Sequence, residues 1–137
     1  MDGRAMAVHC RLLALLLLGA MVVSCSGTVI TNVFWKLSSF QRSDFPEIEI
    51  HNPEQFTVRF GDDGRVTIRA DCNNCIGSYE LTGQHLRLGV LACTRAYCGS
   101  DSLDTEYLRA FTPATAFSTA EGVLTIKAPG AVLTFRQ

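Results

Sequence analysis

The apolar run near the N-terminus constrains this chain most, because it decides which residues are left to fold and in which compartment. Residues 12–23 are apolar apart from Gly19, and the basic residues Arg4 and Arg11 precede them. A helix of this length reaches about 18 Å, which is short of the ~30 Å hydrocarbon core of a membrane. The pattern therefore predicts a cleaved export signal over residues 1–24 rather than a membrane-spanning helix.

The run ends in a lipoprotein processing motif, in which apolar residues and one small residue precede a cysteine. Ser24 is the small residue required before the cut, and the Cys25 sulfur would form the thioether to diacylglycerol. Several acyl chains on one cysteine anchor a protein stably. By resemblance to known lipoproteins, Ser26 instead of aspartate indicates the outer membrane, facing the periplasm, in an organism with two membranes. Ordinary secretory cleavage, which yields a secreted protein, is the alternative.

The remaining residues have the length and charge of a single exported domain. Residues 25–33 are predicted to be a polar tether, and residues 34–137 contain no repeat or low-complexity tract. A domain of roughly 100 residues can bury its own core. The chain has a formal net charge of −1 and no basic stripe, which argues against a nucleic acid as partner.

Four cysteines remain once Cys10 leaves with the signal and Cys25 takes the lipid. An even number in an oxidising compartment predicts two disulfides. The C-x2-C and C-x4-C spacing also resembles a zinc ribbon, which stays an alternative, although we predict no metal and no other cofactor. The four residues are Cys72, Cys75, Cys93 and Cys98.

The pairing of these cysteines can be predicted from the register of a hairpin. If residues 82–85 form its turn, residues that face each other have numbers adding to about 167 or 168. Cys75 and Cys93 then lie opposite each other, and Cys72 and Cys98 follow one step further along the ladder with a small slip. This nested pairing fits one register better than the crossed pairing. A redox motif would instead favour Cys72–Cys75 with Cys93–Cys98.

Hydrophobic alternation predicts mostly short strands. The clearest case is residues 65–70, in which Val66, Ile68 and Ala70 share one face. One helix is indicated by the stripe Leu103, Tyr107, Leu108 and Phe111, with Asp101 or Ser102 as its cap. The segment 38–53 is predicted to be irregular apart from a short strand at 48–50. The predicted strands are residues 34–37, 48–50, 55–60, 65–70, 76–81, 86–91, 116–119, 123–127 and 132–136. The fold class is therefore α+β and mainly antiparallel, a small barrel with one helix.

Residues that could carry catalysis are few, and we predict no catalytic site. His51 and His85 fall in predicted turns and lack a nucleophile or carboxylate in a recognisable spacing. Asp62 and Asp63 precede a glycine and fit a polar turn better than a calcium loop. The C-x2-C pair precedes a predicted strand, whereas thioredoxin-like sites lie at a helix N-terminus.

Several short motifs in order resemble the META domain, also called the HslJ-like family, over residues 34–136. They are Trp35-Lys36-Leu37, Phe60-Gly61-Asp62-Asp63-Gly64-Arg65-Val66, Asp71-Cys72-Asn73, Gly77-Ser78-Tyr79, Gly83 with Leu86, Thr94-Arg95-Ala96-Tyr97-Cys98, Glu106 with Leu108, Gly122-Val123-Leu124 and Leu133-Thr134-Phe135. The resemblance implies a compact, conical, barrel-like domain of bacterial envelope or secreted proteins, some associated with heat stress or antibiotic tolerance. It implies no established catalytic activity. The family usually has glycine where this chain has Asp71.

Three functional hypotheses follow. The first is a non-enzymatic envelope lipoprotein that is held to the membrane by its lipid and binds an unidentified envelope protein or ligand, or protects against stress. The second is an inhibitor-type module that binds an enzyme such as lysozyme, with residues 38–53 as the plugging loop. The third is a thiol-disulfide or zinc protein that uses the four cysteines.

Overall fold

The computed structural model describes residues 30–137, so the predicted signal peptide and its processing residues Ser24 and Cys25 lie outside the described part. Ile30 is buried, and Thr31 pairs with Phe60 at the end of a strand. The indole nitrogen of Trp35 donates a hydrogen bond to the Ile30 carbonyl. Residues 30–33 of the predicted tether therefore pack on the domain. No helix of residues 30–137 is long and apolar enough to cross a membrane.

The described chain forms an eight-stranded closed antiparallel barrel, which confirms the predicted fold class. The elements are β1 (Trp35–Arg42), β2 (Ile48–Glu49), η1 (Pro53–Gln55), β3 (Phe56–Phe60), β4 (Arg65–Ala70), β5 (Asn73–Thr82), β6 (His85–Leu88), β7 (Ala92–Cys93), α1 (Asp104–Phe111), β8 (Ala116–Ala120), β9 (Val123–Ala128) and β10 (Ala131–Arg136). The wall runs in the order β1-β3-β4-β5-β6-β8-β9-β10, and β10 closes it by pairing with β1. The short strands β2 and β7 add to β1 and β5.

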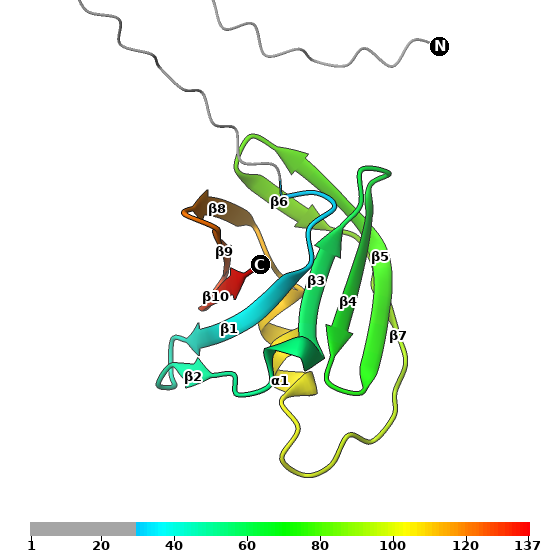
Figure 1. Ribbon diagram of the computed structural model, residues 1–137, viewed down its shortest axis with the longest axis vertical. Coiled ribbons are helices and arrows are strands. Elements are labelled where there is room, and N and C mark those ends of the chain that lie inside the picture. Colours follow the sequence, from blue (N-terminus) through cyan, green and yellow to red (C-terminus); the bar gives the residue numbers. More distant parts are fainter. Residues whose placement is uncertain (1–29) are drawn as a thin grey trace, which may run out of the picture.

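The core follows from the alternation of the strands and from one face of the helix. In β4, Val66, Ile68 and Ala70 point inward, as predicted. Helix α1 buries Tyr107 and Phe111 and contacts β1, β4, β9 and β10. Figure 1 shows the helix behind β1 and β3, on the inner side of the wall. Helix α1 therefore packs against strands on opposite sides of the barrel.

Two strand predictions were wrong, each for a local reason. Strand β1 continues to Arg42, whereas irregular structure was predicted from Ser38. A bulge between Leu37 and Ser39 shifts the alternation, and this conceals the strand in the sequence. The predicted strand at 86–91 stops at Leu88, because an extra residue interrupts the ladder there. Tyr79 pairs with Leu88, whereas Ile76, three residues earlier, pairs with Ala92, four residues later.

The start of β5, predicted at residue 76, and the cap of α1 also differ from the predictions. Strand β5 begins at Asn73, so the turn after β4 consists of Asp71 and Cys72 alone. The residue at the N-cap of α1 is Leu103, not Asp101 or Ser102, and it makes no side-chain cap. The Ser102 hydroxyl instead accepts a hydrogen bond from the Asp104 amide, at 3.2 Å.

Candidate functional site

The four cysteines lie together beside the start of β5 and form two disulfides. Cys72 is bonded to Cys98, and Cys75 is bonded to Cys93, which is the nested pairing. Cys75 and Cys93 face each other directly in the β5–β7 ladder, with their α-carbons 4.0 Å apart. The bonds therefore join β5 to the segment between β6 and α1.

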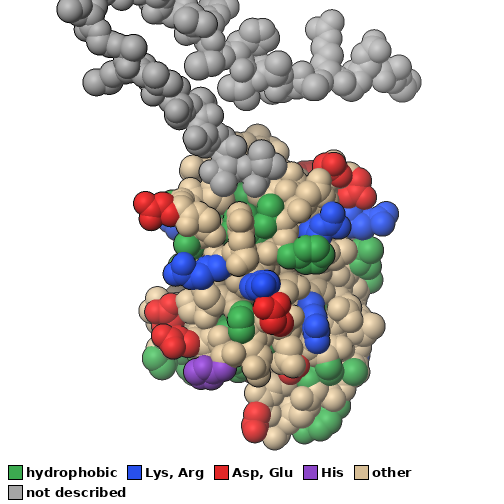
Figure 2. All heavy atoms as spheres, viewed as in Figure 1, with side chains coloured by type: hydrophobic (Ala, Val, Ile, Leu, Met, Phe, Trp, Pro, Cys, Tyr) green, Lys and Arg blue, Asp and Glu red, His purple; other side chains and the backbone are tan. Residues whose placement is uncertain are grey.

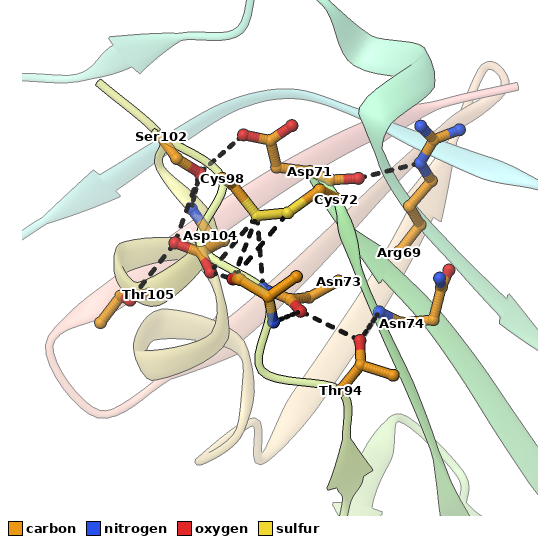
Figure 3. Close-up of a disulfide and its surroundings, with 11 residues drawn as sticks. Arg69, Asp71, Cys72, Asn73, Asn74, Thr94, Cys98, Ser102, Asp104 and Thr105 are labelled. Atoms are coloured by element: carbon orange, nitrogen blue, oxygen red, sulfur yellow. Dashed lines mark hydrogen bonds between the residues drawn. A yellow bond between two sulfur atoms is a disulfide. The ribbon is translucent and has the colours of Figure 1, made fainter. Parts of the chain in front are cut away.

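Asn73, which lies between Cys72 and Cys75, is buried, and both the nitrogen and the oxygen of its side-chain amide form hydrogen bonds (Figure 3). Its nitrogen donates to the Ala96 carbonyl and to the Asp104 carboxylate, both at 3.0 Å. Its oxygen accepts from the Ala96 amide at 2.8 Å and from the Thr94 hydroxyl at 3.0 Å. Asn73 therefore ties β5 to a loop more than twenty residues away and to the start of α1.

Asp71 supplies the sharp turn that precedes this cluster. Its φ of +58° lies in the left-handed region, which glycine adopts without strain and aspartate tolerates better than most residues. Its carboxylate accepts a hydrogen bond of 2.6 Å from the Ser102 hydroxyl, also drawn in Figure 3. The turn is therefore fixed to the loop that leads into α1.

A second feature, which the sequence analysis did not identify, is a groove on the outer face of the barrel with a volume of about 1040 Å³. Strand register explains its lining. One cross-strand row contains Phe34, Arg59, Thr67, Ile76 and Ala92, and the next contains Lys36, Thr57, Arg69, Asn74 and Thr94. Each strand places alternate side chains outward, so the two rows form a continuous surface across β1, β3, β4, β5 and β7. We call this surface the outer groove.

The outer groove is basic and partly apolar. Its charged lining comprises Lys36, Arg59, Arg69 and one acid, Glu54, whose carboxylate lies 3.0 Å from the Lys36 ammonium. Phe34 and Ile76 are exposed, at 63% and 46%. In Figure 2, basic and apolar side chains gather over the middle of this face, and most acidic side chains lie towards its margins.

The two guanidinium groups of the groove have no carboxylate partner within residues 30–137. Arg69 donates from Nε to the Asp71 carbonyl, at 3.0 Å. Arg59 donates from Nη2 to the Asn32 side chain at 3.1 Å, and its buried Nε has no hydrogen-bond partner in the described chain. The Arg59 guanidinium lies 5.4 Å from the centre of the Phe34 ring, which is a cation–π distance. Both arginines keep N–H donors for an anionic group.

The groove lies beside the point where the described chain joins the barrel. The Asn32 amide donates a hydrogen bond of 2.7 Å to the Phe60 carbonyl at the end of β3. Asn32 also contacts Arg59, and Phe34, two residues later, lines the groove. Residues 32–34 of the described chain therefore lie at the edge of the groove.

The sequence matches the META domain over residues 28–137. The chain belongs to the META-domain family. This match confirms the resemblance found in the ordered motifs and covers all of the described residues, 30–137. No curated protein sequence matches the chain.

Solved structures similar to this META domain support the fold alone, because their sequence identities are low. An NMR structure of a protein from Burkholderia xenovorans has a TM-score of 0.64 and 22% identity, covering 78% of this chain and 82% of that one. A crystal structure of a DUF4847 family protein from Bacteroides vulgatus has a TM-score of 0.60 and 14% identity, covering 79% and 94%.

The histidine and carboxylate candidates lie apart from one another in the META domain. His51 follows β2 and lines a shallow surface pocket near Cys98. His85 was predicted to lie in the turn before β6, but it is the first residue of that strand, and it borders a different pocket. Asp63 accepts a hydrogen bond from the Arg65 amide at 3.0 Å, as expected of a polar turn. Within residues 30–137, no three His, Cys, Asp or Glu residues are grouped so as to hold a metal ion.

Two tyrosines have raised pKa values, and both are structural. Complete burial raises the pKa of Tyr107 in α1. Burial, and then the negative charges of Asp63 and Asp62, raise the pKa of Tyr79, whose hydroxyl donates to the Gly61 carbonyl. Both rings pack edge-on against phenylalanines of β3, and neither tyrosine lines the outer groove.

Proposed function

We propose that this META domain is a lipid-anchored, non-enzymatic binding domain of a bacterial-type cell envelope, with the outer groove as its binding surface. The observation that carries the proposal is the pair of guanidinium groups, Arg59 and Arg69, on a concave face without a carboxylate partner in the described chain. Arginine presents a planar fork of donors that suits anionic groups. The groove also offers exposed apolar side chains, and this combination is typical of a binding surface.

The lipid anchor is supported by the processing motif that ends at Cys25. Two disulfides are in keeping with export, because such bonds persist in oxidising compartments. We place the protein at the outer membrane, facing the periplasm, with secretion as the alternative. The membrane is thus one partner, through the lipid, and an envelope component is the other.

A non-enzymatic role is supported by how the reactive groups are used. All four cysteines of the domain are bonded in pairs, and neither bond is the Cys72–Cys75 bond that a C-x-x-C redox site would form. The C-x-x-C motif leads into strand β5, whereas the motif of thioredoxin-like sites lies at the N-terminus of a helix. These features disfavour the thiol-disulfide and zinc alternatives.

The anchor is tested by labelling with fatty acid. We expect wild-type protein to take up the label and Cys25→Ala to lose it and to mature slowly. Mass spectrometry should find Cys25 as the modified first residue. Label in the Cys25→Ala protein, or a mature chain that begins elsewhere, would contradict the anchor.

The groove is tested by retention of an envelope component on immobilised protein. We expect Arg59→Gln combined with Arg69→Gln to abolish retention. The matched control is Arg87→Gln with Arg109→Gln, which removes two exposed arginines outside the groove. Equal retention by both double variants would refute the groove as the binding surface. Protection against heat or antibiotics, which the family resemblance implies, is tested by complementing a deletion strain with the same variants.

An inhibitor of an enzyme such as lysozyme is a second candidate, favoured by one observation. The predicted plugging segment, residues 38–53, contributes residues 38–42 to β1 and residues 48–49 to β2, so residues 43–47 are the loop between these two strands. Tyr97, in the loop between β7 and α1, is however 84% exposed. The loop itself is held in place by the hydrogen bond from the Ala96 amide to Asn73 and by the Cys72–Cys98 bond. Rigid aromatic side chains of this kind are frequent anchors of interfaces.

The inhibitor hypothesis is tested directly with purified lysozyme. We expect Tyr97→Ala to lose inhibition, and Val90→Ala, which changes another exposed apolar residue, to retain it. Absence of inhibition by the wild-type protein would reject this candidate for lysozyme.

A further inference from the structure

We propose that the outer groove binds the phosphate-bearing headgroup of an anionic lipid in the membrane that carries the anchor. The inference rests on the proposed function and deepens it by naming the ligand. It combines three observations: the arrangement of the positive charges, the apolar side chains beside them, and the position of the groove relative to the N-terminal segment.

The positive charges form a zigzag across three strands. Lys36 on β1 faces Thr57 on β3, and Thr57 faces Arg69 on β4. Arg59 lies two residues along β3 from Thr57, so it is the diagonal neighbour of both Lys36 and Arg69. Diagonal neighbours in antiparallel strands are roughly 7–8 Å apart, which is within reach of long side chains. Arg59 and Arg69 can therefore approach one phosphate group from two sides.

The charge balance of the groove favours an anionic ligand. Glu54 offsets Lys36, whereas Arg59 and Arg69 are not offset by any acid that lines the groove. The donors already used by the two arginines go to neutral oxygens, those of Asn32 and of the Asp71 backbone. A phosphate would accept charge-assisted hydrogen bonds from the remaining donors.

The apolar part of the groove favours a lipid over a simple ion. Phe34 lies against Arg59 at one end of its cross-strand row, and Ile76 lies further along the same row, beyond Thr67. Exposed aromatic and aliphatic side chains beside arginine suit the boundary between headgroups and acyl chains, where one side is charged and the other apolar.

The position of the groove favours the membrane over an acidic peptide. Cys25 precedes Phe34 by nine residues, which span at most about 30 Å when fully extended. Since Phe34 is itself part of the groove, a lipidated Cys25 would keep the groove within that distance of the headgroups. Each arginine near an anionic surface contributes about 1 kcal/mol to binding, so two of them add usefully to an anchor.

The test uses vesicles and the chain from residue 26 onward, without its lipid. This protein contains the hydrophobic core and both disulfides of the described residues 30–137, and is expected to fold alone. We expect it to co-sediment with vesicles that contain about one third phosphatidylglycerol, and not with phosphatidylcholine alone. High salt should weaken the binding, because exposed charges are screened.

Variants then locate the binding surface. Arg59→Gln with Arg69→Gln should weaken vesicle binding about 30-fold, which is two contributions of about 1 kcal/mol at about 1.4 kcal/mol per factor of ten. The control pair, Arg87→Gln with Arg109→Gln, should bind like the wild type. An equal loss in both pairs would mean attraction by overall charge and would overturn the proposal.

A fluorescence measurement separates contact from mere proximity. Phe34→Trp adds an exposed indole to a chain whose one tryptophan, Trp35, is buried. We expect its emission to shift to the blue with phosphatidylglycerol vesicles alone, because the indole leaves water. If the wild type does not bind anionic vesicles, while the Arg59 and Arg69 variants still fail to retain an envelope component, the lipid assignment is wrong and the proposed function stands. An acidic peptide would then be the next ligand to test.

Discussion

Replacing Asn73 by alanine should destabilise the domain more than any other single polar substitution near the disulfides. The change removes four hydrogen bonds that join β5 to Thr94, Ala96 and Asp104. A typical buried hydrogen bond contributes about 1 kcal/mol and one to a charged group about 2 kcal/mol. Water can reach part of the emptied site and recover some of this. We therefore expect a loss of about 3–4 kcal/mol in the free energy of unfolding.

The neighbouring residue provides the control for this experiment. Asn74 is exposed, and its side chain makes no hydrogen bond within residues 30–137, so Asn74→Ala should change the stability by less than about 0.5 kcal/mol. Urea denaturation with both disulfides intact measures both variants. Hydrogen exchange at the Ala96 amide, which donates to Asn73, should accelerate in Asn73→Ala alone. A loss below about 1 kcal/mol, or equal losses in the two variants, would refute the role assigned to Asn73.

Four further predictions concern the core, the disulfides, alkaline pH and the turn at Asp71. Phe111→Ala should cost about 3–5 kcal/mol in urea denaturation, and Leu108→Ala, which is only partly buried, clearly less. Peptide mapping without reductant should recover Cys72–Cys98 and Cys75–Cys93. Each bond should contribute about 3 kcal/mol to the free energy of unfolding, and reduction of both should cost less than the sum because the two loops overlap. Burial raises the pKa of Tyr107 in the folded state above its ordinary value of 10.0, so the free energy of unfolding should fall above pH 10 by about 1.4 kcal/mol per pH unit. Tyr107→Phe should lessen this fall in stability at alkaline pH, whereas Tyr97→Phe, which changes an exposed tyrosine, should not. Asp71→Gly should be nearly neutral, because relief of the positive φ offsets the lost Ser102 bond, whereas Asp71→Ala keeps the strain and should cost about 1–2 kcal/mol.

Features set by neighbouring residues could be predicted from the sequence. The strict alternation in residues 65–70 gives β4 its bounds, and the spacing of Tyr107 and Phe111 places the buried face of α1. The cysteine register also depends on one short hairpin, β5–β6, whose pairs Thr82–His85 and Tyr79–Leu88 lead to Cys75–Cys93 with a shift of one residue. In each case the deciding contacts lie close together along the chain.

Features set by distant residues could not be predicted. Closure of the barrel pairs β1 with β10, which no local pattern indicates, and the bulge after Leu37 hides the strand that makes the pairing. The outer groove has the same origin. Arg59 and Arg69 are ordinary outward residues of two strands, and their proximity to Lys36 appears only when the order β1-β3-β4 is known.

The pair of disulfides at the start of β5 and the outer groove share strand β7, which connects the stability of the fold with its proposed binding function. Strand β7 is two residues long and pairs only with β5, too short a ladder to hold an edge by itself. The Cys75–Cys93 bond fixes it, and Thr94, which follows it, bonds to the Asn74 backbone and to the Asn73 side chain. Ala92, Cys93 and Thr94 line the groove. Loss of the Cys75–Cys93 bond should therefore release the side of the groove formed by β7 before it unfolds the barrel, because the other sides belong to the closed sheet.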